Sequence, residues 1–165
     1  MVDFDPVGTI AFFRERHRVE SLTTAAVLRA LPAGSLSWAP HAGSSTAGAT
    51  AWTIVRCLGL CTRLTGLPTA EISHASHPDH AALVDAFMTE SATLAEKLLG
   101  LQQSDWLEEH SVTSRGHLLM NLPLGQILWL FHVDAIHHRG QLSTFLRGFG
   151  AKVPSIYGPS GDSQA

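Results

Sequence analysis

The side chains best suited to chemistry gather in one short segment, Phe131 to Gly150, with the sequence FHVDAIHHRGQLSTFLRGFG. It holds three of the chain's ten histidines, His132, His137 and His138, and also the acid Asp134. An imidazole and a carboxylate can ligate a divalent metal together, or an acid can orient a histidine that works as a general base. The segment is therefore a metal site, a catalytic base or a core helix that happens to carry histidines.

Helical spacing separates these histidines. Residues three and four apart are neighbours on a helix, so Asp134, His138 and Gln141 share one stripe, with apolar residues at both of its ends. We expect this stripe to face inward, where Asp134 and His138 would form a bidentate pair for Zn, Ni, Mn or Fe. An Asp-His ion pair without metal is the alternative, because buried polar groups must satisfy one another. His132 and His137 are predicted on other faces of the helix.

Two neighbours in the same segment have simpler expected roles. Arg139 is expected on a solvated face or between helices. Gly140 costs about 1 kcal/mol relative to alanine inside a helix, so its expected use is close approach of another helix. Elsewhere, Cys57 and Cys61 lie four apart and are interpreted as two small buried apolar residues, rather than as a thiolate ligand or a redox-sensitive thiol.

The remaining histidines give weaker signals. His17 is interpreted as a half-buried helix residue. The string HASHPDH reads as a solvated loop rather than a metal site, because Pro78 directs the chain into a helix and turns His80 away from His74. His41 and Tyr157 are both expected at the mouth of the site.

Four helices are needed to position these residues. Apolar periodicity and stop signals predict helices over about residues 6–31, 46–64, 77–99 and 122–147, which is a four-helix bundle. The expected N-terminal signals are Asp5-Pro6, Ser45, Ser76 or His77, and Asn121. Residues 102–120 are predicted to be a loop with a weak hairpin. Residues 1–150 form one domain, and residues 151–165 form a loop-like tail.

Composition excludes several classes of protein. Of the 165 residues, 45% are hydrophobic and 15% charged, which excludes a disordered chain. The formal net charge is −3 and no basic stripe is present, so nucleic-acid binding is not expected. The first residues do not resemble a signal peptide, and the longest apolar run is too short to span a membrane. We expect a soluble, cytoplasmic protein.

Several strings together resemble the DinB/YfiT-like superfamily of bacterial four-helix-bundle proteins. HHRGQLSTFLR is similar to its fourth-helix signature, LSWAPHAGSSTAGATAW to the loop that enters its second helix, and DWLEEHSV to the segment before the last helix. KVPSIYGPSGD is similar to the tail of one subgroup. The resemblance covers nearly the whole chain and implies the bundle fold and a homodimer.

The resemblance also implies a metal site that this chain retains only in part. Relatives hold a divalent metal with three histidines, at positions that correspond here to Thr53, Asp134 and His138, so one of three ligands matches. Some relatives use the metal to transfer low-molecular-weight thiols. One interpretation is a degenerate divalent-metal site in a metal-dependent thiol S-transferase that acts on a small thiol or electrophile. The alternative is a non-catalytic dimeric binding or stress-response module without metal.

Overall fold

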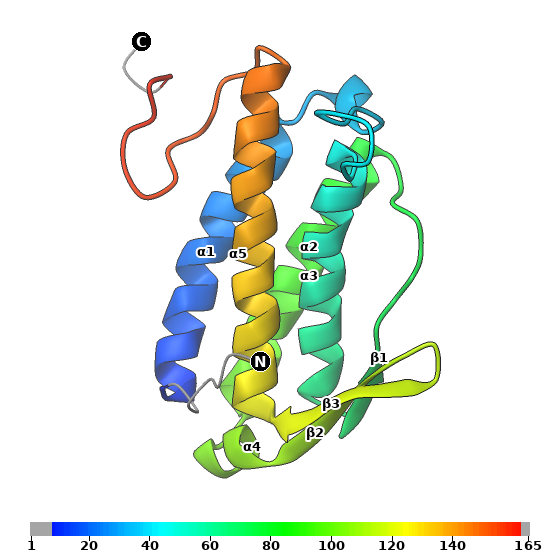
Figure 1. The fold of residues 1–165 in the computed structure, drawn as a ribbon. Helices are drawn as coiled ribbons and strands as arrows, with labels where there is room; N and C mark the ends of the chain where they lie inside the picture. Colours follow the sequence, from blue (N-terminus) through cyan, green and yellow to red (C-terminus); the bar gives the residue numbers. More distant parts are fainter. Residues whose placement is uncertain (1–7, 163–165) are drawn as a thin grey trace.

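Four long helices run side by side in the computed structural model, which describes residues 8–162 (Figure 1). They are α1 (Ile10–Ala30), α2 (Ala47–Leu64), α3 (His80–Gly100) and α5 (Leu124–Gly148). Helix α2 packs against α3 and α5, and α1 packs against the same two helices from the other side. The four predicted helices are therefore present.

Side-chain caps set where three of these helices begin. Thr9, Thr46 and Asp79 each accept a hydrogen bond from the backbone N–H three residues further on, which satisfies one of the free donors of the first turn. The predicted starts at residues 6 and 77 were thus three to four residues early, since the first helix begins at Ile10 and the third at His80. The predicted Asp5-Pro6 signal lies outside the described residues.

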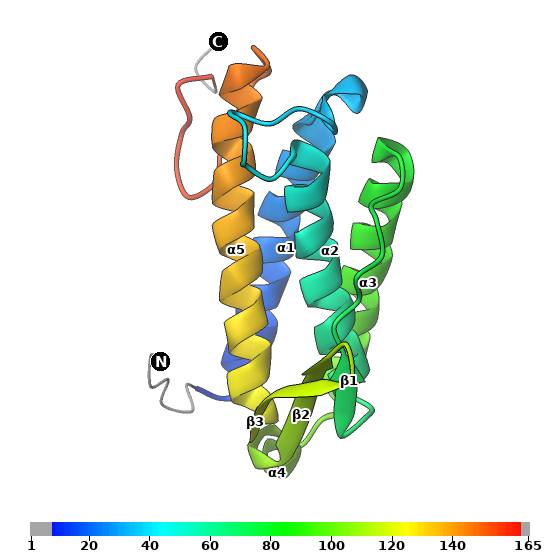
Figure 2. The same cartoon turned by 45° about the vertical axis from the view of Figure 1, so that its right-hand side comes forward.

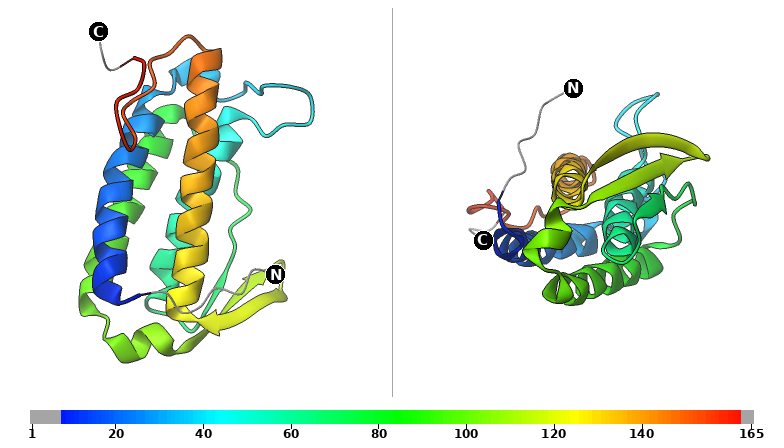
Figure 3. Two further views of the ribbon diagram at one scale, coloured as in Figure 1. Left: turned by 60° about the vertical axis from the view of Figure 1, so that its left-hand side comes forward. Right: turned by 90° about the horizontal axis from the view of Figure 1, so that it is seen from below.

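A small sheet corrects the all-α expectation. Strands β1 (Thr69–Glu71), β2 (Glu109–Ser114) and β3 (His117–Pro123) form a sheet in that order, with β1 and β2 parallel and β2 and β3 antiparallel. With the short helix α4 (Gln103–Leu107), the sheet lies across one end of the bundle, as the view from below in Figure 3 shows. A 3₁₀ turn at Ala33–Ser35 follows α1.

The hairpin between β2 and β3 confirms the weak hairpin expected within residues 102–120. Its turn places Arg115 and Gly116 at positive φ, 52° and 76°, a conformation that Gly116 adopts without steric cost. Asn121 was wrongly expected to begin the last helix. It pairs with Ser111 in the hairpin, and α5 begins at Leu124, directly after a proline that could not donate to a ladder.

The bundle core is apolar apart from a few buried polar side chains, of which Glu20 and Arg139 form a charged pair. Figure 2 shows the four helices side by side, with the sheet at their lower end. The buried face of α5 includes Leu128, Ala135, Arg139, Leu142 and Leu146, spaced three, four or seven apart. Among residues 8–162, no helix is both long and apolar enough to cross a membrane.

Candidate functional site

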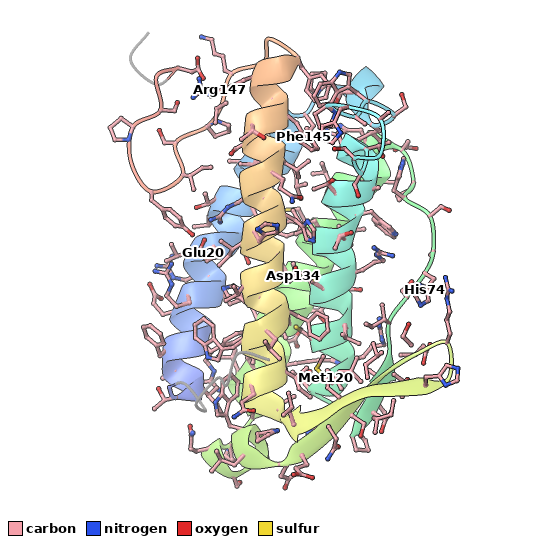
Figure 4. The ribbon with its side chains drawn as sticks, viewed as in Figure 1. Glu20, His74, Met120, Asp134, Phe145 and Arg147 are labelled. Carbon is pink, nitrogen blue, oxygen red and sulfur yellow. The ribbon has the colours of Figure 1, made fainter. Side chains whose placement is uncertain are left out.

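The stripe of α5 that carries the polar residues lies beside the buried face rather than on it. The buried spacing runs through Ala135 and Arg139, so Asp134 and His138 are turned one residue away from the core. Their side chains are 47% and 23% exposed. Figure 4 shows Asp134 on the side of α5 that faces α2. The expected inward stripe is therefore corrected to the rim of the bundle, between α5 and α2.

The histidine of this stripe has a polar partner at each ring nitrogen. His138 Nε2 lies 3.5 Å from Asp134 Oδ1, and its Nδ1 lies 3.0 Å from Gln141 Oε1. The Gln141 amide nitrogen lies in turn 3.0 Å from His137 Nε2, which fixes the amide so that its oxygen faces His138. Because an oxygen atom faces each ring nitrogen, both partners of His138 are matched best when Nδ1 and Nε2 each donate an N–H.

The electrostatics of the pair agree with this assignment. The hydrogen bond with Asp134 raises the pKa of His138 above its ordinary value, against the opposing effect of burial. The same hydrogen bond lowers the pKa of Asp134 below its ordinary value. Each residue thus favours the charged form of the other, as in an ion pair.

Helix α2 supplies the opposite wall. Because α2 and α5 run antiparallel, Cys57 meets Asp134, with its Sγ donating to Oδ2 over 3.4 Å. Thr53, one turn earlier, lies at the level of His138. Its hydroxyl donates to the Ala49 carbonyl over 3.0 Å and accepts from Arg56 Nη2 over 2.9 Å.

The cysteine is a poor source of thiolate. Burial, followed by the charge of Asp134, raises the pKa of the Cys57 thiol far above its ordinary value. Burial also raises the pKa of Cys61 to about 12. Both cysteines are free and buried, in agreement with the interpretation as small apolar residues.

These donors do not fit the three-histidine centre that the sequence resemblance implied. Thr53 offers a neutral hydroxyl already used twice, both ring nitrogens of His138 face polar partners, and burial raises the pKa of the Cys57 thiol. Within residues 8–162, no group of three His, Cys, Asp or Glu side chains is placed to hold a metal ion. The assignment of Thr53, Asp134 and His138 as ligands stays a prediction.

A cleft of about 330 Å³ lies at the outer end of the α5 stripe, within the size range of small-molecule sites. We call it the α2–α5 cleft. Its lining is Pro40, His41, Ser44, Ser45, Thr50, His138, Gln141 and Phe145. His41, which was expected at the mouth of the site, lies in this lining together with His138. The loop before α2 thus forms a polar wall opposite His138.

The other sequence candidates lie apart from this cleft. His74 bonds Ser114 Oγ on the sheet and His80 bonds the Leu28 carbonyl, so the HASHPDH histidines do not converge. Figure 4 shows His74 far from Asp134. His17 is more deeply buried than expected, at 2% exposed, with Nε2 held 3.0 Å from the Ser91 carbonyl oxygen.

Tyr157 was wrongly expected at the site mouth. The tail carries it to the opposite side of α5, where its hydroxyl accepts from Arg139 Nη2 over 2.6 Å and donates to Glu20 Oε2 over 2.8 Å. Arg139 was expected on a solvated face or between helices. It lies between α5 and α1, where it is 1% exposed and paired with Glu20. No local pattern indicates this cluster, because its members come from three distant segments of the chain.

Arg56 is the residue near the site that the sequence analysis missed. It follows Thr53 by three positions on α2, so helical spacing alone could have placed it beside the α5 stripe. Its charge is close enough to oppose the raised pKa of His138.

Four long helices with a sheet across one end, and a polar stripe between the second and last long helices, define a helical-bundle class of protein. The chain belongs to the DinB family, whose model matches residues 8–164. It resembles YrdA of Bacillus subtilis (strain 168), described as uncharacterized, with 26% identity over 161 residues, 95% of this chain and 93% of YrdA.

Two solved structures share the fold. A DinB-like protein from Bacillus cereus ATCC 10987 superposes with a TM-score of 0.76 and 24% identity, over 90% of this chain and 98% of that one. The DinB-like protein YjoA from Bacillus subtilis gives a TM-score of 0.71 and 16% identity, over 90% and 99% of the two chains.

Proposed function

We propose that this chain is a DinB-like binding protein that takes a small molecule in the α2–α5 cleft without a bound metal. The observation that carries the proposal is the double engagement of His138, by Asp134 at Nε2 and by Gln141 at Nδ1. An imidazole held in this way is neither a free metal ligand nor a free general base. It is a fixed donor group at the floor of a cleft.

The neighbouring side chains support binding rather than catalysis. A nucleophilic thiol needs a lowered pKa, whereas burial raises that of Cys57. The cleft instead offers hydrogen-bonding groups from His41, Thr50 and Gln141 beside the apolar ring of Phe145. A few placed polar groups beside an apolar surface are typical of a site that binds and orients a small ligand.

Metal analysis of untagged protein purified without chelators tests the first part of the proposal. We expect well below one equivalent of Zn, Ni, Mn or Fe per chain, and no rise in melting temperature when these ions are added. His138→Ala should give the same metal content as wild type. One equivalent of metal that disappears in His138→Ala would overturn the proposal.

Ligand titration tests the second part. Low-molecular-weight thiols and their electrophile adducts should shift the NMR signals of the Gln141 side-chain amide and of Thr50, which line the cleft. His74, which bonds Ser114 away from the cleft, supplies a control signal that should stay unchanged. Shifts confined to residues outside the cleft would contradict this part.

The second candidate function is a metal-dependent S-transferase in which Asp134 and His138 hold a divalent metal. It is favoured by one observation, the placement of a carboxylate and an imidazole on one accessible face one turn apart. Metal uptake would have to displace the proton on His138 Nε2, so it should strengthen with rising pH. A thiol-transfer rate that depends on added metal and is lost in His138→Ala would favour this candidate.

The homodimer expected from the resemblance is likewise a proposal. Sedimentation equilibrium of the 165-residue chain distinguishes a monomer of 17.7 kDa from a dimer.

A further inference from the structure

Arg56 carries a positive charge that no acid among the described residues pairs with. Among residues 8–162, its guanidinium makes no ion pair, although the side chain is half-buried. Nη1 donates to the Ser73 carbonyl over 3.2 Å and Nη2 donates to Thr53 Oγ1 over 2.9 Å. Nε is buried with no acceptor among the described residues. Placing a partly desolvated charge among neutral groups costs free energy that an anion would offset.

The same molecule holds a second buried guanidinium, that of Arg139, whose Nε also has no acceptor among the described residues. Arg139 is paired with the Glu20 carboxylate at 2.6 Å and also bonds the Tyr157 hydroxyl. Arg56 has hydroxyl and carbonyl partners of the same kind but lacks the carboxylate. The missing component around Arg56 is therefore a negative charge.

A cavity is available for that charge. About 360 Å³ of space lies against Arg56, between the outer face of α2 and the connection from β1 to α3. Its lining includes Trp52, Thr53 and His77, and no lining residue carries a carboxylate. Figures 1 and 2 show this connection running beside α2 along most of the bundle. We call this space the Arg56 cavity.

Two hydrogen bonds hold the wall of the Arg56 cavity in place. Trp52 Nε1 donates to the Ala75 carbonyl over 2.9 Å, and Arg56 itself bonds Ser73. The backbone N–H groups at the start of α2 are already used, because those of Ala47 and Gly48 bond loop carbonyls. The guanidinium is thus the charged donor that faces this space.

We propose that the Arg56 cavity binds the carboxylate or phosphate oxyanion of a small organic molecule. Guanidinium groups bind both oxyanions through paired, charge-assisted hydrogen bonds, and the cavity is large enough for a compact ligand. The indole of Trp52 supplies an aromatic wall for the ligand's apolar part. The Arg56 cavity shares only Ser45 with the lining of the α2–α5 cleft, so this site goes beyond the proposed function.

Calorimetric titration with benzoate and with inorganic phosphate, at matched ionic strength in chloride, tests the proposal. Wild type should bind at least one of the two saturably, and the two arms show which oxyanion is preferred. Arg56→Gln should weaken binding at least tenfold. The affinity of Arg56→Lys should lie between those of wild type and Arg56→Gln. Arg63→Gln is the matched control, since Arg63 lies on the same helix and also bonds a backbone carbonyl, that of Glu71.

Wild type alone gives a second measurement that does not depend on how a variant folds. The buried Nε–H of Arg56 should give its own NMR signal, and that signal should shift along the same binding curve as the calorimetry. The proposal is overturned if neither anion binds better than chloride, if Arg56→Gln binds as wild type does, or if Arg63→Gln is equally weakened. Metal content tests the proposed function and does not report on the Arg56 cavity. A failure of the proposed function can therefore be told apart from a failure of the oxyanion site.

Discussion

The Arg139 guanidinium and the Glu20 carboxylate form an ion pair between α5 and α1, with Nη1 2.6 Å from Oε2 and both side chains 2% exposed. Tyr157, from the tail, bonds both partners. Burial alone would raise the pKa of Glu20, but the hydrogen bonds from Arg139 and Tyr157 outweigh it and lower that pKa. Together with Tyr157, the pair therefore links α1, α5 and the tail through buried hydrogen bonds.

Removing one partner of this pair should be costly. Glu20→Ala would leave the Arg139 charge buried without a counter-charge, and we expect a loss of about 3–5 kcal/mol in the free energy of unfolding. Glu15→Ala is the matched control, because Glu15 pairs with Arg18 on the exposed side of the same helix. That change should cost less than about 1 kcal/mol. Urea unfolding curves that show equal losses for both variants would contradict this linking role.

Gly140 and Gly125 should respond in opposite directions to alanine. Gly140 was expected at a close helix contact, but a Cβ built there meets nothing within 4 Å. Gly140→Ala should therefore stabilise by about 0.5–1 kcal/mol, through helix propensity alone. At Gly125 a Cβ would collide with the buried indole of Trp106, so Gly125→Ala should cost about 1–3 kcal/mol. Thermal unfolding of the two variants measures whether each change raises or lowers stability. If Gly140→Ala is less stable than wild type, Gly140 makes a close contact after all.

These cases show which features the sequence could predict. The number and approximate bounds of the long helices follow from local periodicity and stop signals. The closeness of Asp134 and His138 follows from helical spacing, and the 3.5 Å separation agrees with it. The side of α5 that is buried did not follow, because the local pattern allows Arg139 either a solvated face or a place between helices and does not decide between them. Its burial depends on Glu20, 119 positions earlier in the chain.

Long-range pairing also explains the other differences. Strand β1 is three residues long and pairs with β2 about forty positions later, so no local pattern marks it as a strand. Asn121 has the side chain of a helix cap, but its place in the hairpin is decided by pairing with Ser111. The environment of Arg56 depends on how the connection after β1 packs against α2. Helical spacing does not predict this packing.

The histidine packed between α1 and α5 should make the fold sensitive to acid. Burial, followed by the nearby His17, lowers the pKa of His132 from 6.5 to about 4. Between these values the unfolded chain binds a proton that the folded chain does not, so stability falls as pH falls. His132→Phe should remove this effect, and the wild-type loss attributable to His132 is on the order of 2 kcal/mol.

Unfolding free energies at pH 7, 6, 5 and 4.5 measure the effect of His132. The variant should lose less stability than wild type across this series, because phenylalanine keeps the contacts with Phe13 and Trp129 and carries no proton. Val133→Phe is the control, since Val133 is exposed on the same helix and carries no titratable group, so this change should leave the pH dependence as in wild type. Parallel curves for wild type and His132→Phe would exclude His132 as the source.

Restoring two histidines should create a metal centre. Thr53 lies one turn before Cys57, and His138 one turn after Asp134, so the contact between Cys57 and Asp134 sets positions 53 and 138 at one level. Thr53→His with Asp134→His would place imidazoles at all three positions that the sequence resemblance implied as ligands, and would remove the carboxylate that raises the pKa of His138. We expect about one Zn or Ni per chain, and at a hundredfold excess over Kd a stabilisation of about 2.7 kcal/mol. Asp134→His alone should bind more weakly, and adding His138→Ala to the pair should abolish binding. If the double variant takes up no more metal than wild type, these positions do not converge and the ion pair cannot be a replacement for a metal centre.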